Sequence, residues 1–186
     1  MKKIIILFVA IVGLSLNINQ SLMAQEQPIA NKLYHTEFGG PGLIMSANFD
    51  SRFKSNTRLG FGYRLGAGFG VKKFDERLND PNTGNTYYEK IPRTVYAIPI
   101  GLNYVFGNSN SNSAFEVGGG VSLLSRKVSL FNYEVKKHGH MIGYVAFMYR
   151  IVPANGGFSF RAGFTPIIGT AGDMFPMGAV GFGYAF

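Results

Sequence analysis

Several charged side chains of this chain occur singly among small and aromatic residues, so that they could share one compartment. The six that share a face of successive segments are Asp50, Arg52, Arg64, Glu116, Arg150 and Arg161. Such carboxylates and guanidinium groups could line a gated ion path or could neutralise one another as buried ion pairs. An unpaired buried charge is costly, so we expect an ion-pair network in which Glu116 pairs with Arg64 or Arg161.

A second set of charges is basic and follows the apolar segments. Its members are Lys72, Lys73, Arg126, Lys127, Lys136 and Lys137. Because the chain carries a formal net charge of +8, these side chains could contact phosphates or other anions from exposed loops. The alternative is a set of solvated loops balanced by Asp75, Glu76, Asp80 and Glu134. The residues alone leave both interpretations open.

The elements that must position these side chains are strands. Between Leu59 and Lys72, large apolar residues at odd positions alternate with glycine, Arg64 and Lys72 at even positions. A period of two is typical of a strand, and so many glycines would destabilise a helix. The same alternation recurs in the segments 43–53, 96–106, 115–126, 140–151, 158–168 and 179–186.

We expect the large apolar face of these strands to point away from the interior. The opposite face consists mostly of Gly, Ala and Ser with isolated charges, whereas a water-facing surface would carry many Lys, Glu and Thr residues. A crowded interior of small and charged residues inside an apolar band is typical of a membrane β-barrel. The alternative, a soluble calycin-like barrel, would place the large apolar residues inside.

The links between these segments alternate in length. We expect short links at 54–57, 107–113 and 152–157, and longer ones at 74–93, 127–138 and 169–175. Bacterial outer-membrane barrels alternate short periplasmic turns with longer outside loops and have an even number of strands. An additional strand is therefore expected at 33–38, turning at 39–42. The predicted fold is all-β, an eight-stranded antiparallel up-and-down transmembrane β-barrel.

The beginning of the chain has the order of a secretory signal peptide. Two lysines precede an apolar run from Ile4 to Leu14, and small residues follow up to Ala24. That run is too short to span a bilayer as a helix, which needs roughly 20 residues. We expect a cleaved signal peptide at 1–24 and one domain at 25–186. The absence of cysteine excludes a disulfide framework and a lipoprotein anchor.

The end of the chain places apolar residues at alternate positions before a terminal aromatic. These residues are Val180, Phe182, Tyr184 and Phe186. The pattern resembles the C-terminal signal by which the insertion machinery recognises outer-membrane barrels. With the motifs at 37–42, 99–107 and 160–166, the chain resembles the small outer-membrane β-barrel domain proteins common in Bacteroidota, which have an OmpA/OmpX-like eight-stranded architecture. The resemblance implies an outer-membrane location, lipopolysaccharide and other outer-membrane lipids as neighbours, and contact with the insertion machinery during biogenesis.

Three functions are compatible with this architecture. We predict a non-enzymatic structural or interaction barrel with a side-chain-filled lumen, whose outer loops contact lipopolysaccharide or an extracellular partner. The alternatives are a lipid A-modifying enzyme and a narrow porin-like channel for small solutes. Some eight-stranded barrels modify lipid A with Ser, His and an acidic residue, and the candidates are Ser125, Ser129, Glu134, His138 and His140. Their spacing matches no such motif and no metal-ligand pattern, so we expect no catalytic residue, metal or cofactor, and no nucleic-acid partner.

Overall fold

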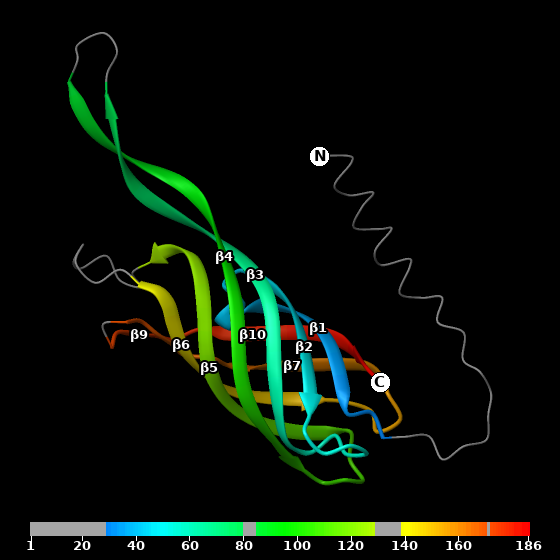
Figure 1. Cartoon of the computed structure of the whole chain (residues 1–186). Helices are drawn as coiled ribbons and strands as arrows, with labels where there is room; N and C mark the ends of the chain where they lie inside the picture. Colours follow the sequence, from blue (N-terminus) through cyan, green and yellow to red (C-terminus); the bar gives the residue numbers. More distant parts are fainter. Residues whose placement is uncertain (1–28, 80–84, 129–138, 171) are drawn as a thin grey trace, which may run out of the picture.

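The computed structural model describes residues 29–79, 85–128, 139–170 and 172–186, which form a closed β-barrel (Figure 1). The wall consists of β1 (Lys32–Gly39), β2 (Met45–Arg52), β3 (Gly60–Asn79), β4 (Thr86–Gly107), β5 (Ser113–Val128), β6 (Gly139–Ile151), β7 (Gly157–Phe164) and β10 (Gly178–Ala185). Consecutive strands pair antiparallel, and pairing of β10 with both β7 and β1 closes the barrel. The predicted all-β, eight-stranded antiparallel barrel is confirmed.

The two ends of the barrel differ. At the end that we call the terminal end, the N–H of Lys32 donates to the carbonyl oxygen of Phe186 over 3.1 Å. The short connections 53–59, 108–112 and 152–156 lie at this end, as the alternation of links predicts. At the opposite end, which we call the hairpin end, β3 and β4 continue beyond the other strands (Figure 1).

The alternation of side chains decides which residues face outward. Phe61 and Phe158 are 66% and 64% exposed on the outer surface, whereas Arg64 and Ser159 on the same strands are 3% and 2% exposed. Large apolar side chains therefore cover the outside, and small or charged ones fill the lumen. This agrees with the size of the barrel, because eight strands leave an interior just wide enough for side chains.

The predicted first strand is confirmed as β1. Leu33 lies opposite Ala185 of β10 on one edge and opposite Asp50 of β2 on the other. A 3-10 turn, η1 (Gly40–Gly42), follows it, and its three residues are buried. The expected turn at 39–42 therefore folds inward instead of standing above the wall.

One facing prediction near this turn is wrong. The period of two places Leu43 outward with Met45, but Leu43 leaves η1 with φ 75° and packs against an interior apolar cluster. Its neighbour Ile44 is 52% exposed instead. The positive φ at Leu43 turns the backbone between η1 and β2. Leu43 and Ile44 therefore lie on the opposite faces from those that an unbroken strand would give them.

The predicted loop at 74–93 is also wrong. In the described part of this segment β3 and β4 remain paired, from Lys72 opposite Arg93 to Asn79 opposite Thr86. Figure 1 shows this hairpin projecting beyond the barrel, away from the C-terminus. Aromatic and β-branched residues in this segment favour strands. The hairpin also continues the pairing of β3 with β4 that begins in the barrel wall, so its strands do not have to form a new pair from the start.

Two short strands complete the hairpin end. β8 (Ile167–Ile168) pairs with β6 and with β9 (Met174–Phe175). The segment expected as a loop at 169–175 therefore ends in a strand. Within the described ranges, none of the helical turns is long and apolar enough to cross a membrane.

Three layers fill the lumen from the terminal end to the hairpin end. The first is a small apolar cluster of Ala30, Leu33, Val152 and Ala185. The second is charged and is described below. The third is an apolar cluster of Val95, Ala97, Leu124, Ile142, Tyr144 and Ile167. Ala30, Leu33 and Val152 border the same small gap as Asp50 and Arg52, so apolar side chains pack directly against the charged residues.

Candidate functional site

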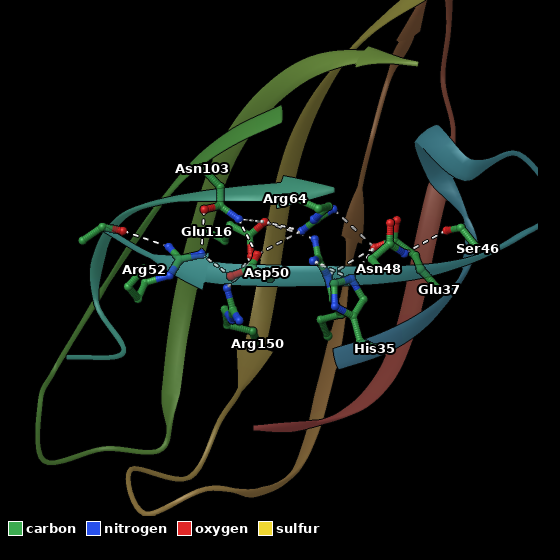
Figure 2. A network of polar contacts seen from close by, with 12 residues as sticks. His35, Glu37, Ser46, Asn48, Asp50, Arg52, Arg64, Asn103, Glu116 and Arg150 are labelled. Carbon is green, nitrogen blue, oxygen red and sulfur yellow. Dashed lines mark hydrogen bonds and ion pairs between the residues drawn. The ribbon is translucent and has the colours of Figure 1, made fainter. Parts of the chain in front are cut away.

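The structure brings the six predicted lumen residues together in the middle layer. Asp50 and Arg52 come from β2, Arg64 from β3, Glu116 from β5, Arg150 from β6 and Arg161 from β7, and each is at most 5% exposed. Figure 2 shows the carboxylates lying between guanidinium groups from opposite walls. We call this set, with the further members described below, the lumen network.

Glu116 is the centre of the lumen network. Its Oε1 accepts hydrogen bonds from Arg64 Nη2 at 2.7 Å and from Arg161 Nη2 at 3.1 Å. Its Oε2 accepts from Arg150 Nη1 at 2.8 Å. One carboxylate therefore links three strands across the lumen, through hydrogen bonds in which both partners are charged and which are stronger than neutral ones.

Asp50 is the second centre, nearer the terminal end. Arg52 donates to its Oδ1, and Asn103 Nδ2 donates to its Oδ2 over 2.6 Å. Arg52 also donates to Asn103 Oδ1 at 2.7 Å and to the carbonyl oxygen of Gly60 at 2.9 Å. The four groups join β2, β3 and β4 in one closed set of contacts.

His35 and Glu37 of β1 also belong to the lumen network, although the sequence did not single them out. Glu37 Oε2 lies 3.3 Å from Arg161 Nε and 3.6 Å from Arg64 Nη1. His35 Nε2 lies 3.2 Å from Arg161 Nη1. The signal that could have found them is the alternation of Tyr34, Thr36 and Phe38 on the outer face. That alternation covers only three residues, so it does not show which side chains of this strand face inward until the pairing with β10 is known.

Among the described residues, the lumen network holds four arginines against three carboxylates, an excess of one positive charge if His35 is neutral. The spaces that border its carboxylates and guanidinium groups are small. A gap bordered by Asp50, Arg52 and Arg150 measures about 10 Å³, which is at the lower limit for a single water molecule. The arrangement therefore crosslinks the strands electrostatically and fills the cross-section.

Arg58 closes the terminal end. It lies in the turn between β2 and β3 and is 7% exposed. Its guanidinium donates to the carbonyl oxygens of Val152 at 2.7 Å, Ser109 at 2.8 Å and Asn108 at 3.2 Å, and also to that of Ser111. One side chain thus ties all three short turns together. The sequence gives no signal for this, because the contact joins turns that are about fifty to ninety residues apart.

The basic residues expected in loops stand on strands at the hairpin end. Lys72 and Lys73 belong to β3, and Arg126 and Lys127 belong to β5. The guanidinium of Arg126 lies 5.9 Å from the ring centre of Phe74, over its face. Two further predicted residues, Lys136 and Lys137, lie outside the described residues. The loop placement is therefore corrected for four residues, and the barrel rim presents their charges.

An exposed ion pair braces the protruding hairpin. Arg93 Nε and Nη2 donate to the two carboxylate oxygens of Glu76, each over 2.7 Å. These hydrogen bonds hold the pKa of Glu76 below its ordinary value. The pair joins β3 to β4 beyond the barrel wall.

The residues of the C-terminal signal pattern all face outward. Val180, Phe182, Tyr184 and Phe186 are between 39% and 57% exposed. Phe186 stacks on Tyr34 of β1 with ring centres 5.4 Å apart. The last strand therefore contributes a continuous apolar stripe where the barrel closes.

The candidates for lipid A chemistry are only partly within the described residues. Ser125 Oγ accepts a hydrogen bond from the backbone N–H of Tyr96 at 2.9 Å, and His140 Nδ1 lies 3.1 Å from the carbonyl oxygen of Leu124. Ser125 therefore provides an acceptor for a backbone group of β4 and His140 contacts one of β5, where the pairing of β5 with β6 is irregular. Ser129, Glu134 and His138 lie outside the described residues. In the part of the chain that is described, no three His, Asp or Glu side chains are grouped to hold a metal ion.

Comparison with known proteins returned no matching family model, curated protein or solved structure. The eight-stranded antiparallel barrel is consistent with an OmpA/OmpX-like fold.

Proposed function

We propose that this chain is a non-enzymatic integral outer-membrane β-barrel that is sealed to solutes and presents its hairpin end outside the cell. The observation that carries the proposal is that the barrel, unlike a soluble protein, has apolar side chains on its outer surface and charged side chains inside. Large side chains such as Phe61, Leu102 and Phe158 are at least 60% exposed, while Glu37, Asp50 and Glu116 are at most 2% exposed. Only an apolar surrounding makes such a surface favourable, and a lipid bilayer supplies one.

The orientation follows from the two ends of the barrel. In outer-membrane barrels the short turns face the periplasm and the longer extensions face outward. The terminal end has the short turns tied by Arg58, so we place it in the periplasm. The export signal expected at 1–24, the C-terminal pattern ending in Phe186 and the resemblance to small Bacteroidota outer-membrane barrels support the same placement. The insertion machinery would recognise that terminal strand.

The lumen favours a sealed barrel over a narrow channel. Glu116 and Asp50 bridge opposite walls through arginines, and a space beside them measures about 10 Å³. An ion would have to break several charge-assisted hydrogen bonds at once in order to pass. The lumen network is therefore assigned a structural role, and the role of the protein lies in what the hairpin end contacts.

The hairpin end suits contact with anionic outer-membrane lipid. Lys72, Lys73, Arg126 and Lys127 stand on β3 and β5 at this end. Each basic residue near an anionic lipid surface contributes about 1 kcal/mol. We propose that lipopolysaccharide phosphates are the neighbours of this rim, while the longer hairpin reaches beyond the bilayer toward an extracellular partner.

Fractionation of a Gram-negative host expressing the full chain tests the proposal. The protein should be recovered in the outer membrane, and the unheated sample should migrate differently from the boiled sample on a denaturing gel, since folded barrels resist detergent. A variant lacking residues 1–24 is the matched control and should not reach the outer membrane. Recovery of the full chain in the soluble periplasm, or identical migration with and without heating, would contradict the proposal.

A further inference from the structure

The hairpin end contains an apolar cavity that is separate from the lumen network. Its volume is about 350 Å³, within the range of small-molecule sites. Interior side chains of Leu43, Val95, Val128 and Met177 line one side of it, and Lys72 is the charged residue of its lining. Because its lining is apolar, the cavity is suited to a hydrocarbon rather than to a polar solute.

The cavity opens sideways through the barrel wall. Its lining also includes Ile44 and Val71, which are 52% and 57% exposed on the outer surface. Buried Val95 and the interior residues Leu43 and Val128 line the same cavity, so the cavity reaches from the outer surface into the barrel. It does so where the edge of β3 is left without a neighbour among the described strands, because the last pair between β2 and β3 joins Met45 to Phe69.

The turn η1 creates this opening. Instead of extending the wall beside β3, it bends into the lumen, where Ser122 Oγ donates a 2.8 Å hydrogen bond to the carbonyl oxygen of Pro41. Leu43 then lies over Gly70, and a Cβ at position 70 would come within 2.8 Å of the Leu43 Cβ. Glycine at this position therefore leaves room for the turn to pack inside the barrel. The wall beside β3 then stays open from Gly70 toward the hairpin end.

The inner limit of the cavity is also apolar. Leu43 and Met177 pack against the interior cluster that contains Val95 and Tyr144. The lumen network lies nearer the terminal end, beyond η1. A guest entering from the side would therefore meet hydrocarbon side chains along its length and would not reach the buried charges.

We propose that this cavity binds one acyl chain of an anionic lipid, which enters sideways from the outer leaflet while its phosphate lies near Lys72. The inference rests on the proposed membrane location. An acyl chain suits the site because it has no backbone polar groups that would need partners inside. The lateral opening faces the compartment in which such chains are abundant, and the position of Lys72 in the lining favours an anionic head group over a zwitterionic one.

Photo-crosslinking in vesicles tests this proposal. The full mature chain is reconstituted in phosphatidylcholine vesicles that contain phosphatidic acid with a diazirine on its acyl chain, and the labelled residues are identified by mass spectrometry. Labels are expected on interior Val95, Val128 or Met177 in addition to outward Phe69 and Tyr96. Labels on outward residues alone would overturn the cavity proposal and leave the membrane location intact. An absence of outward labels would instead contradict the membrane location.

Matched variants make the cavity test specific. Val128→Phe narrows the cavity and should remove the interior labels, whereas Val117→Phe, on the outer face of the same strand, should leave them unchanged. Recovery of the heat-modifiable form shows that each variant is folded. Interior labels that persist in folded Val128→Phe would count against the cavity as the binding site.

The head-group part of the proposal has its own control. Lys72→Gln should reduce interior labelling by phosphatidic acid about fivefold, the equivalent of about 1 kcal/mol for one lysine beside an anionic lipid. The neighbouring Lys73→Gln, which faces outward, should have a much smaller effect, and labelling by a phosphatidylcholine probe should not change in either variant. Equal losses in the two variants would refute the role assigned to Lys72.

Discussion

Replacement of Glu116 by glutamine tests the energetic role of the lumen network. Glutamine keeps the volume of the side chain but removes the negative charge that Arg64, Arg150 and Arg161 share at 2.7–3.1 Å. The excess positive charge of the network would rise from one to two. No bulk water lies beside it to compensate, since Glu116 is 2% exposed.

The expected loss of stability is large. Removal of one partner from a buried ion pair costs about 3–5 kcal/mol, which corresponds to roughly a hundredfold to several-thousandfold change in the ratio of folded to unfolded protein. Urea titration in detergent micelles, with the heat-modifiable band as the measure of folded protein, would show this as a lower midpoint.

Glu76→Gln is the matched control for this measurement. It removes the same charge from an ion pair with Arg93 whose side chains are 43% and 32% exposed. Solvent screens such a pair, so the midpoint should change far less than in Glu116→Gln. If the two variants lose similar stability, or if Glu116→Gln is as stable as the parent chain, the reasoning about the lumen network is refuted.

Three further predictions follow from other contacts. Arg58→Ala removes a charged donor shared by carbonyl groups of two other turns. We therefore expect the free energy of unfolding to fall by about 1.5–3 kcal/mol and proteolysis at 108–112 and 152–156 to become faster. A cleavage rate equal to that of the parent chain would contradict the role of Arg58 in holding the turns together. The lowered pKa of Glu76 means that its pair with Arg93 stabilises the hairpin fully above the ordinary glutamate pKa of about 4.3, and that this contribution is lost as the pH falls through the lowered folded value. The protection of the amides at 72–79 against exchange, corrected for the intrinsic exchange rate at each pH, should therefore fall at acidic pH in the parent chain more than in Glu76→Gln, and an equal fall would contradict the assignment. Because side chains fill the lumen, the reconstituted protein should show no stable openings in planar bilayers, and regular single-channel steps would refute the sealed lumen.

The parts of the fold that the sequence predicts are those governed by the period of two. Arg64 and Glu116 were placed inward because each lies among small residues opposite an aromatic face. The first strand followed from the need for an even number of strands. Both inferences depend on a repeat that the barrel imposes on every strand, so they hold without knowledge of the pairing partners.

The parts that the sequence did not predict depend on contacts between distant segments. Arg58 meets the carbonyl of Val152 only after all eight strands are paired. Leu43 turns inward because of a positive φ at the end of η1, which no apolar repeat encodes. The segment 74–93 resembles a loop because its charges interrupt the apolar pattern, although the backbones of 74–79 and 86–91 stay paired. The lateral cavity arises from the last two features together and has no local signature.

The central claim is that the outer face of the barrel contacts lipid, and fluorescence quenching tests it most directly. The chain has no tryptophan, so single substitutions give unambiguous signals. In vesicles of phosphatidylcholine brominated along its acyl chains, Leu65→Trp on the outer face should be strongly quenched, whereas Asn110→Trp in a short turn should be quenched little. Strong quenching at position 65 alone is the predicted result. Equal or absent quenching at the two positions would contradict the account.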